Sequence, residues 1–371
     1  VLLAAGAGLL IRSVANLRAI DPGVDTQALA IVDATMPLGL NAAERRRTIL
    51  SMVDRLRALP GVTAVAAAQK LPLRGSGDNW GIAVRGQPEA GGTTAFRMVS
   101  RDYFATLGMR ITRGRGFDGS DRETSGRVVV INEALAATYF PNEDPIGQVI
   151  LTGFDDAGER VIGVVENAAE ADLQDPPVPA RYMLYEHLPV VWHQVSFALR
   201  ATDARATAPL VEAARARIAS AGSQLAVQET TTMQHVFELA VGPAGQVVTL
   251  LSLLAGLALV LGAIGVYGVI SHFVSRRSRD YGIRLALGER PSRVERQIVL
   301  RGASLVAIGS ALGIAAALYL TKVLATLLYG IDATDPAAMA AAVAVLLAVG
   351  MIAAFIPARR ASRMEPAMFR E

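Results

Sequence analysis

The last third of the chain contains three uncharged apolar stretches that are long enough to cross a membrane. They cover residues 247–273, 302–320 and 337–355 of the 371-residue sequence. A transmembrane helix needs about 20 such residues, because its backbone polar groups must be paired within the helix itself. We therefore predict a helix in each stretch, which makes the chain an α-helical membrane protein.

The charged residues around these stretches predict an orientation. Residues 276–301 carry eight arginines against three acidic residues, whereas the loop near Asp332 and Asp335 is acidic. Arginine-rich loops stay in the cytoplasm. We therefore expect residues 276–301 and the C-terminus in the cytoplasm, and the large polar segment of roughly 15–240 in the periplasm of a bacterium. The protein would be a multi-pass protein of the inner membrane.

Strand and helix signals alternate in this polar segment, which predicts an α+β domain over residues 21–240. Near its start, strands at 28–36 and 62–68 flank a helix at 42–59, in which Asn41 and Glu44 have capping-box spacing. The same order recurs near its end, at 195–199, 207–221 and 226–229. Between the two β-α-β units we expect an insertion at about 90–190, with strands at 128–131 and 161–165 and a helix capped by Asn132.

The chain begins with eleven apolar, uncharged residues, which are too few to span a bilayer. We interpret residues 1–20 as the outer end of a truncated first transmembrane helix and its stalk; an amphipathic surface helix is the alternative. A second apolar helical face leads from the periplasmic domain into residues 241–371. These two helices are expected to form a stalk, with a hinge at Gly242 and Pro243, unless they are unrelated amphipathic helices.

The sequence lacks the patterns of common catalytic and metal sites. No glycine-rich loop precedes Lys70 or Lys322, there is no His-Glu-x-x-His, and cysteine is absent. His187 and His193 have no further ligand pattern, so we expect ordinary histidines and no metal site. We predict no catalytic residues, no enzyme activity in this chain and no nucleic-acid partner.

Small residues recur within two of the apolar stretches. Their spacing permits close helix contact, with the bias of the whole sequence toward Ala and Gly as the alternative explanation. The residues are Gly262, Gly265, Gly309 and Gly313.

The arginine-rich loop contains a compact apolar pattern that charge alone does not explain. Ile283 and Leu287 are four residues apart, so a short helix would present them together beside Leu285, with Arg284 at the edge. Gly288 is placed to end this helix, and Pro291 suits the first turn of the next. A groove in a soluble partner could accept this face. Simple anchoring of the arginines to lipid is the alternative.

Several separate motifs carry a resemblance to one family. Residues 279–288 resemble the coupling-helix signature of FtsX-like permeases, the transmembrane subunits of MacB-type ABC transporters, and residues 357–366 are similar to the C-terminal tail of that family. Residues 103–109, 114–117, 130–133 and 144–147 resemble motifs of the MacB-like periplasmic core domain. The start within a helix is similar to the second half of acidobacterial-type duplicated permeases; a single-copy permease cut at its N-terminus would look nearly the same.

The resemblance implies four transmembrane helices per permease unit, with the periplasmic domain between the first and second. It implies a cytoplasmic ATPase that binds ATP and Mg, no cofactor in this chain, and mechanotransmission through the coupling helix and stalk. The implied ATPase contacts are Asp280, Gly282, Ile283, Arg284, Ala286, Leu287 and Gly288. The family usually has Glu where Asp280 stands and Ala where Glu289 stands, which leaves the strength of coupling open.

The expected function is therefore efflux or extraction of a substrate such as an antimicrobial or a lipid. Expected partners are the ATPase, a second permease half or a second copy, the lipid membrane and a periplasmic adaptor. One alternative is a signal transducer that regulates a periplasmic protein such as a cell-wall hydrolase without transport. A weaker one is a passive membrane-anchored binding domain.

Overall fold

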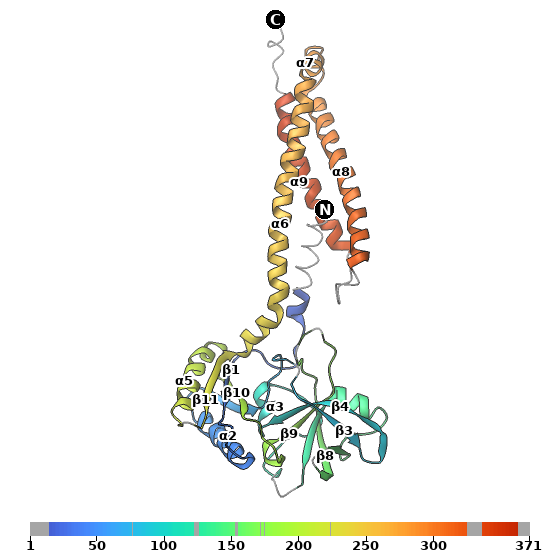
Figure 1. Cartoon of the computed structure of the whole chain (residues 1–371). Helices are drawn as coiled ribbons and strands as arrows, with labels where there is room; N and C mark the ends of the chain where they lie inside the picture. Colours follow the sequence, from blue (N-terminus) through green and yellow to red (C-terminus); the bar gives the residue numbers. More distant parts are fainter. Residues whose placement is uncertain are drawn as a thin grey trace. The chain divides into compact units, whose positions relative to one another are not determined.

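The computed structural model describes residues 15–362, apart from residues 76, 122–125, 153–154, 171, 174, 223 and 325–335. The chain divides into two compact units, whose elements are labelled in Figure 1. One runs from Ile20 to Val241, and the other combines Val1–Ala19 with Gly242–Glu371. The expected end of a first transmembrane helix, at residues 1–11, lies outside the described residues, as does the acidic loop at Asp332 and Asp335.

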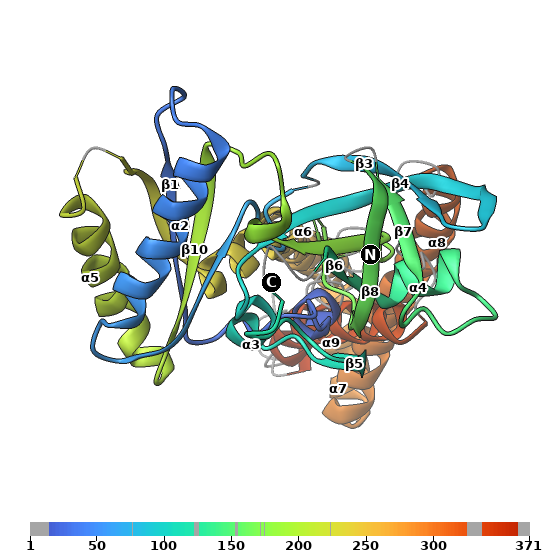
Figure 2. The same ribbon diagram turned by 90° about the horizontal axis from the view of Figure 1, so that it is seen from below.

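The first part of the Ile20–Val241 unit is an antiparallel sheet covered by two helices. Its strands lie in the order β11 (Ala226–Thr232), β1 (Leu29–Thr35), β10 (Gln194–Ala201) and β2 (Val62–Ala68). Helices α2 (Ala42–Arg57) and α5 (Thr207–Ala219) pack on these strands, as Figure 2 shows. The two predicted β-α-β units are therefore present, and their strands interleave in one sheet.

Helix α2 shows how local sequence directs this packing. Asn41 and Glu44 form the predicted capping box, with the Asn41 side chain accepting from the Glu44 N–H at 3.0 Å and the Glu44 carboxylate accepting from the Asn41 N–H at 2.9 Å. The buried residues Ile49, Met52, Val53 and Leu56 follow helical spacing, so they form one apolar face toward the sheet.

The inserted part is a closed ring of strands. Its order is β4 (Gln87–Val99), β3 (Asn79–Val84), β7 (Val149–Thr152), β8 (Asp155–Val165), β6 (Val128–Asn132) and β9 (Ala180–Leu184), and the parallel pairing of β9 with β4 closes it. Strand β5 (Ile111–Gly114) adds to β8. The short helices of the whole unit are α3 (Tyr103–Leu107), α4 (Glu133–Tyr139), η1 (Tyr185–His187) and η2 (Ala204–Ala206), the last of which precedes α5. The ring begins at Asn79, earlier than the expected start near residue 90.

The core of this unit is one continuous apolar cluster. It includes Met52 and Leu56 of α2, Val32 of β1, and Phe96 and Met183 of the ring, each at most 2% exposed. The predicted N-cap Asn132 begins α4, since its side-chain oxygen accepts from the Leu135 N–H at 2.9 Å. Sequence patterning thus positions both the sheet helices and the helix of the insertion.

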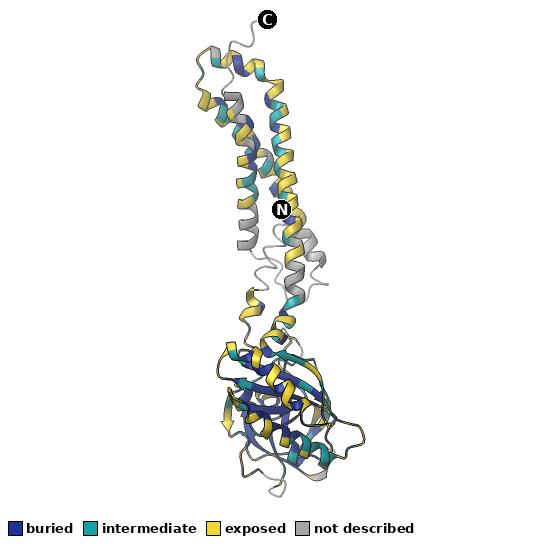
Figure 3. Ribbon diagram, turned by 90° about the vertical axis from the view of Figure 1, so that its left-hand side faces the viewer, coloured by how far each residue is buried: buried dark blue, intermediate teal, exposed yellow. Residues whose placement is uncertain are grey.

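The second unit consists of long helices. They are α6 (Met233–Arg276), whose first residues belong to the Ile20–Val241 unit, the short α7 (Ser278–Ala286), α8 (Pro291–Leu324) and α9 (Pro336–Ser362). Among the described residues, Ser252–Arg276 and Pro291–Ala316 are long and apolar enough to cross a membrane, and Ala344–Pro357 is a shorter apolar segment. Figure 3 shows the exposed residues along α6, which include Leu253, Leu257 and Leu261.

Two expectations for these helices stay predictions. Helix α6 continues through Gly242 and Pro243, so the pair does not break it, and its role as a hinge stays a prediction. A Cβ added at Gly262, Gly265 or Gly309 meets no described atom within 4 Å, so the role of these glycines in helix packing also stays a prediction. A Cβ at Gly350 of α9 would instead lie 2.5 Å from Val306 Cγ2 of α8, and this contact fixes the close approach of these two helices.

Candidate functional site

Helix α7 is joined to α6 by a sharp turn that is hydrogen-bonded on both sides. The Arg277 N–H donates to the carbonyls of Phe273 and Val274, at 3.3 and 3.2 Å, and its own carbonyl accepts from the Tyr281 N–H at 3.1 Å. The Ser278 hydroxyl donates to the Ser275 carbonyl at 2.9 Å. The beginning of α7 is therefore fixed to the end of α6.

The other end of α7 closes in a Schellman motif. The Glu289 N–H donates to the Arg284 carbonyl at 3.0 Å, and the Gly288 N–H donates to the Leu285 carbonyl at 3.1 Å. Gly288 has φ of +91°, a left-handed conformation in which a side chain would be strained. The structure thus confirms that Gly288 ends the helix, and α8 begins at Pro291 as expected.

One face of α7 packs on the neighbouring helices. Tyr281 is 3% exposed and belongs to a small apolar cluster with Ile270 and Val274 of α6 and Val294 and Ile298 of α8. Leu285 packs against this cluster, so it faces inward and does not lie beside Ile283 and Leu287 on one open surface. The sequence pattern alone had grouped the three residues because it did not show where α6 and α8 lie.

The opposite face of α7 is open. Ile283 is 54% exposed and Leu287 is 82% exposed, and the exposed Arg284 guanidinium approaches the Gln297 amide oxygen at 3.5 Å. Asp280 is exposed in the first turn, where a carboxylate interacts favourably with the helix dipole. Gly282 is buried and Ala286 ends the helix.

Many of the residues that precede and follow the open face of α7 in the sequence are arginines. Arg277 and Arg301 lie over the Phe273 ring, with their guanidinium carbons 4.7 and 4.8 Å from its centroid. Cation–π contacts of this kind hold two positive charges close together at the end of α6. Further exposed arginines stand at positions 276, 279, 290, 293 and 296. The segment around α7 therefore exposes both an apolar pair and several positive charges.

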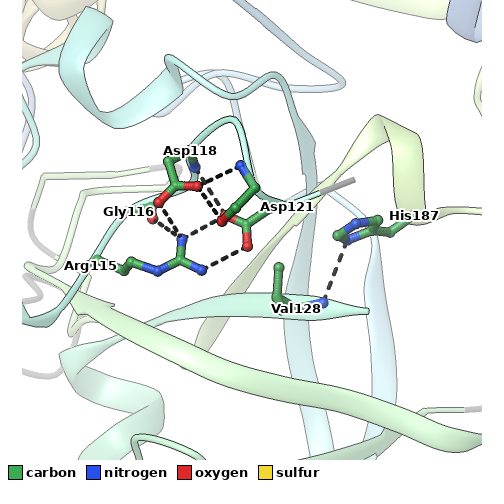
Figure 4. A network of polar contacts seen from close by, with 7 residues as sticks. Arg115, Gly116, Asp118, Asp121, Val128 and His187 are labelled. Atoms are coloured by element: carbon green, nitrogen blue, oxygen red, sulfur yellow. Dashed lines mark hydrogen bonds and ion pairs between the residues drawn. The ribbon is translucent and has the colours of Figure 1, made fainter. Parts of the chain in front are cut away.

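The Gly114–Phe117 motif of the other unit forms a polar network, drawn in Figure 4. Arg115 donates to both carboxylate oxygens of Asp121, at 2.6 and 2.8 Å, and forms an ion pair with Asp118 at 3.2 Å. Burial raises the pKa of Asp121, but the hydrogen bonds from Arg115 and the Asp118 N–H outweigh it, so the pKa lies below its usual range. Nearby, His187 is buried and its Nδ1 accepts from the Val128 N–H at 3.5 Å.

This network closes a loop and does not form a reaction centre. The Asp121 side chain is 4% exposed and both of its oxygens are occupied by Arg115. Close packing explains why positions 114 and 163 are glycines. A Cβ added at Gly114 would lie 2.3 Å from the Ile162 carbonyl oxygen, and one at Gly163 would lie 2.1 Å from the Arg115 carbonyl oxygen. The motif therefore has a structural role: its Arg115 holds together the part of the chain that follows β5.

Two buried arginines of the ring were not singled out from the sequence. Arg97 of β4 pairs with Glu170, and Arg181 of β9 pairs with Glu159 at 3.4 Å, with both members of the second pair 0% exposed. The available signal was position: Arg97 stands between Phe96 and Met98, and Arg181 stands in the otherwise uncharged strand Ala180–Leu184. Without a fold, the same pattern also fits an edge strand with exposed arginines.

Two known protein domains match this chain. Residues 10–217 match the MacB-like periplasmic core domain, and residues 252–366 match the FtsX-like permease C-terminal domain. The chain belongs to the FtsX-like, MacB-type family of ABC-transporter permeases. The two matched models describe a periplasmic core domain and the C-terminal domain of a permease.

Curated relatives are similar to the chain over most of its length. The macrolide export ATP-binding/permease protein MacB of Shigella flexneri is 30% identical over 274 residues, which cover 72% of this chain and 42% of the relative. MacB of Chromobacterium violaceum is 27% identical over 277 residues, with the same two coverages. The chain thus spans less than half the length of these relatives.

Solved structures of periplasmic or extracellular domains are also similar. The periplasmic region of MacB from Actinobacillus actinomycetemcomitans has a TM-score of 0.39 and 17% identity, and the match covers 58% of this chain and 94% of that one. The extracellular domain of the transporter YknZ has a TM-score of 0.39 and 15% identity over 54% of this chain and 100% of that one. The fold described above rests on the strands and helices of this chain itself.

Proposed function

We propose that this chain couples ATP hydrolysis by a separate cytoplasmic ATPase, which holds ATP and Mg, to conformational change in the periplasm. The observation that carries the proposal is the geometry of α7. A helix that is fixed at both ends and open on one face can bind a partner and move with it as a rigid element.

The open face of α7 has the composition of a docking surface. Full burial of side chains such as Ile283 and Leu287 contributes about 1.5–3 kcal/mol each. The surrounding arginines favour an acidic groove and would speed its approach. The ATPase contact would be made by Ile283, Arg284 and Leu287, with Gly282, Ala286 and Gly288 shaping the helix and Asp280 at its start.

We further propose the membrane topology. Residues 276–301 lie in the cytoplasm and the Ile20–Val241 unit lies in the periplasm, in line with the positive-inside rule. The permease unit has four transmembrane helices, the first of which precedes the periplasmic domain. A helical stalk carries that domain, and Gly242 with Pro243 acts as its hinge.

A second permease half or a second copy of the chain would complete the transporter. The open space beside Gly262, Gly265 and Gly309 supports a helix contact of this kind, because glycines permit close approach of another backbone. A periplasmic adaptor is a further proposed partner. The proposed cargo is an antimicrobial or a lipid, which is exported or extracted; the names of the relatives as macrolide exporters support this class.

The test is to remove the apolar pair without disturbing the fold. In Ile283→Ser/Leu287→Ser, both substituted side chains are mostly exposed, so the helix should keep its structure. We expect loss of co-purification with a co-expressed MacB-type ABC ATPase subunit and loss of ATPase stimulation. Leu38→Ser is the matched control, because Leu38 is 76% exposed in the other unit.

Two variants of α7 separate geometry from composition. Gly288→Pro cannot adopt φ of +91° and lacks the N–H that bonds Leu285, so it should uncouple the ATPase; Gly288→Asn, which tolerates this conformation, should retain most coupling. Arg284→Glu should also weaken docking. Normal co-purification and normal stimulation in the double serine variant would refute the docking assignment and favour lipid anchoring.

A further inference from the structure

The Ile20–Val241 unit contains a cavity of about 500 Å³ beside the ring of strands. Its floor is the outer face of β4, where Thr93, Ala95 and Arg97 alternate with Phe96 and Met98 of the core. One wall is the segment 167–170, and another is the proline-rich segment 175–179. Ile20 and Asp21 also line the cavity. Cavities of this volume hold a single drug-sized molecule.

The walls are fixed in place by hydrogen bonds. The Ala95 N–H donates to the Pro179 carbonyl at 2.8 Å, and the Ala169 N–H donates to the Pro22 carbonyl at 2.9 Å. Gly23 packs so closely that an added Cβ would lie 1.9 Å from the Asn167 carbonyl oxygen. A site with ordered walls loses little conformational entropy when a ligand enters.

The charges that line the cavity favour a cation. Arg97 is 2% exposed, and both its Nε and its Nη2 donate to the same oxygen of Glu170, so its charge is neutralised within the protein. Lys70, which interacts with Arg97 and Glu170, does not line the cavity. Asp21 and Asp175 add two exposed carboxylates at the rim.

The rest of the lining is largely apolar. Its apolar part is made by alanines 95, 168 and 169, by Leu173, by Ile20 and by the proline segment, in which Val178 is 42% exposed. Asn79, Thr93 and Asn167 are its uncharged polar residues. We propose that this cavity binds a small amphipathic cation, with the apolar body against β4 and the prolines and the ammonium group toward Asp21 and Asp175. The inference concerns binding to the periplasmic unit and does not depend on ATPase docking.

The test uses two dyes that share a fluorophore and differ in charge. Dansylcadaverine carries an ammonium group and dansyl-aminocaproate carries a carboxylate; both brighten in an apolar site. They are titrated against the full chain in nanodiscs without nucleotide, with empty nanodiscs as the background. We expect saturable binding of the cation that weakens as salt is added, and weaker binding of the anion.

Two variants locate the binding site. Asp21→Asn/Asp175→Asn should weaken binding of dansylcadaverine by about tenfold and should not weaken binding of the anion. Asn at position 21 keeps a side-chain oxygen for the Gly23 N–H, which now bonds Asp21 at 2.9 Å. Thr93→Trp should fill the cavity and reduce binding of both dyes.

The matched control is Asp54→Asn/Glu212→Gln, which removes two charges from side chains that are 76% and 70% exposed on α2 and α5. It should bind like the unmodified chain. The proposal fails if dansylcadaverine shows no saturable binding, if the Asp21/Asp175 variant binds it unchanged, or if Thr93→Trp has no effect. Normal ATPase stimulation in these variants would show that a change in dye binding arises at the cavity and not from a defect in ATPase docking.

Discussion

The ion pair inside the ring of strands allows a quantitative test of the fold. Arg181 and Glu159 are both 0% exposed, and the Arg181 guanidinium lies over the Phe96 ring with its carbon 5.3 Å from the centroid. Burial lowers the pKa of Arg181, and the charge of Glu159 acts in the opposite direction. Arg181 Nε and Nη2 have no hydrogen-bond partner in the described part of the chain, so this pair is costly to keep buried.

We predict that Arg181→Met destabilises the Ile20–Val241 unit by about 3–5 kcal/mol, because a buried carboxylate loses the guanidinium that compensates it. The double variant Arg181→Met/Glu159→Leu removes both charges and should recover most of this loss, or become more stable than the unmodified unit. The apolar replacements fit a cluster that already includes Val161 and Met183.

Tryptophan fluorescence provides a local assay. The chain has two tryptophans, Trp80 and Trp192, and both lie in this unit. Trp80 stacks on Phe96, with 5.5 Å between the ring centroids, and Phe96 is also the ring that Arg181 covers. Urea unfolding followed by this signal therefore reports the unit that contains the ion pair. A loss below about 1 kcal/mol in Arg181→Met, or a double variant less stable than Arg181→Met alone, would refute the reasoning.

Two further predictions concern other contacts. Asp121→Asn should destabilise the same unit by about 1–3 kcal/mol at neutral pH, since the pKa of Asp121 is lowered on folding. That contribution is present above the unfolded pKa near ~4 and is lost as pH falls through the folded pKa, so the difference should shrink in acid; a pH-independent difference in urea unfolding would contradict it. Gly350→Leu should lower the melting temperature of the chain in detergent, because Val306 leaves no room for a side chain, and Val306→Ala should restore part of the loss. Equal melting of Gly350→Leu and the unmodified chain would contradict the packing.

The elements that could be predicted from sequence are those with strong local signals. The capping pair Asn41 and Glu44, the N-cap Asn132 and the terminal Gly288 each satisfy a backbone group within a few residues, so the pattern itself contains the answer. The closure of β9 on β4 depends on a pairing between residues about 85 apart, such as Ala95 with Ala180. No local pattern records such a pairing, so the ring and its buried arginines had to be seen in the structure.

Helix α7 shows the same division within a single site. Periodicity identified a short apolar helix with a glycine stop, but it could not distinguish Leu285 from Ile283, since both are apolar and two residues apart. The distinction comes from α6 and α8, which cover Tyr281 and Leu285 and leave Ile283 and Leu287 open. The covered face attaches α7 to its neighbours, and the open face remains available to a partner. Force transmission through α7 would depend on this difference between its two faces, which the sequence pattern alone does not show.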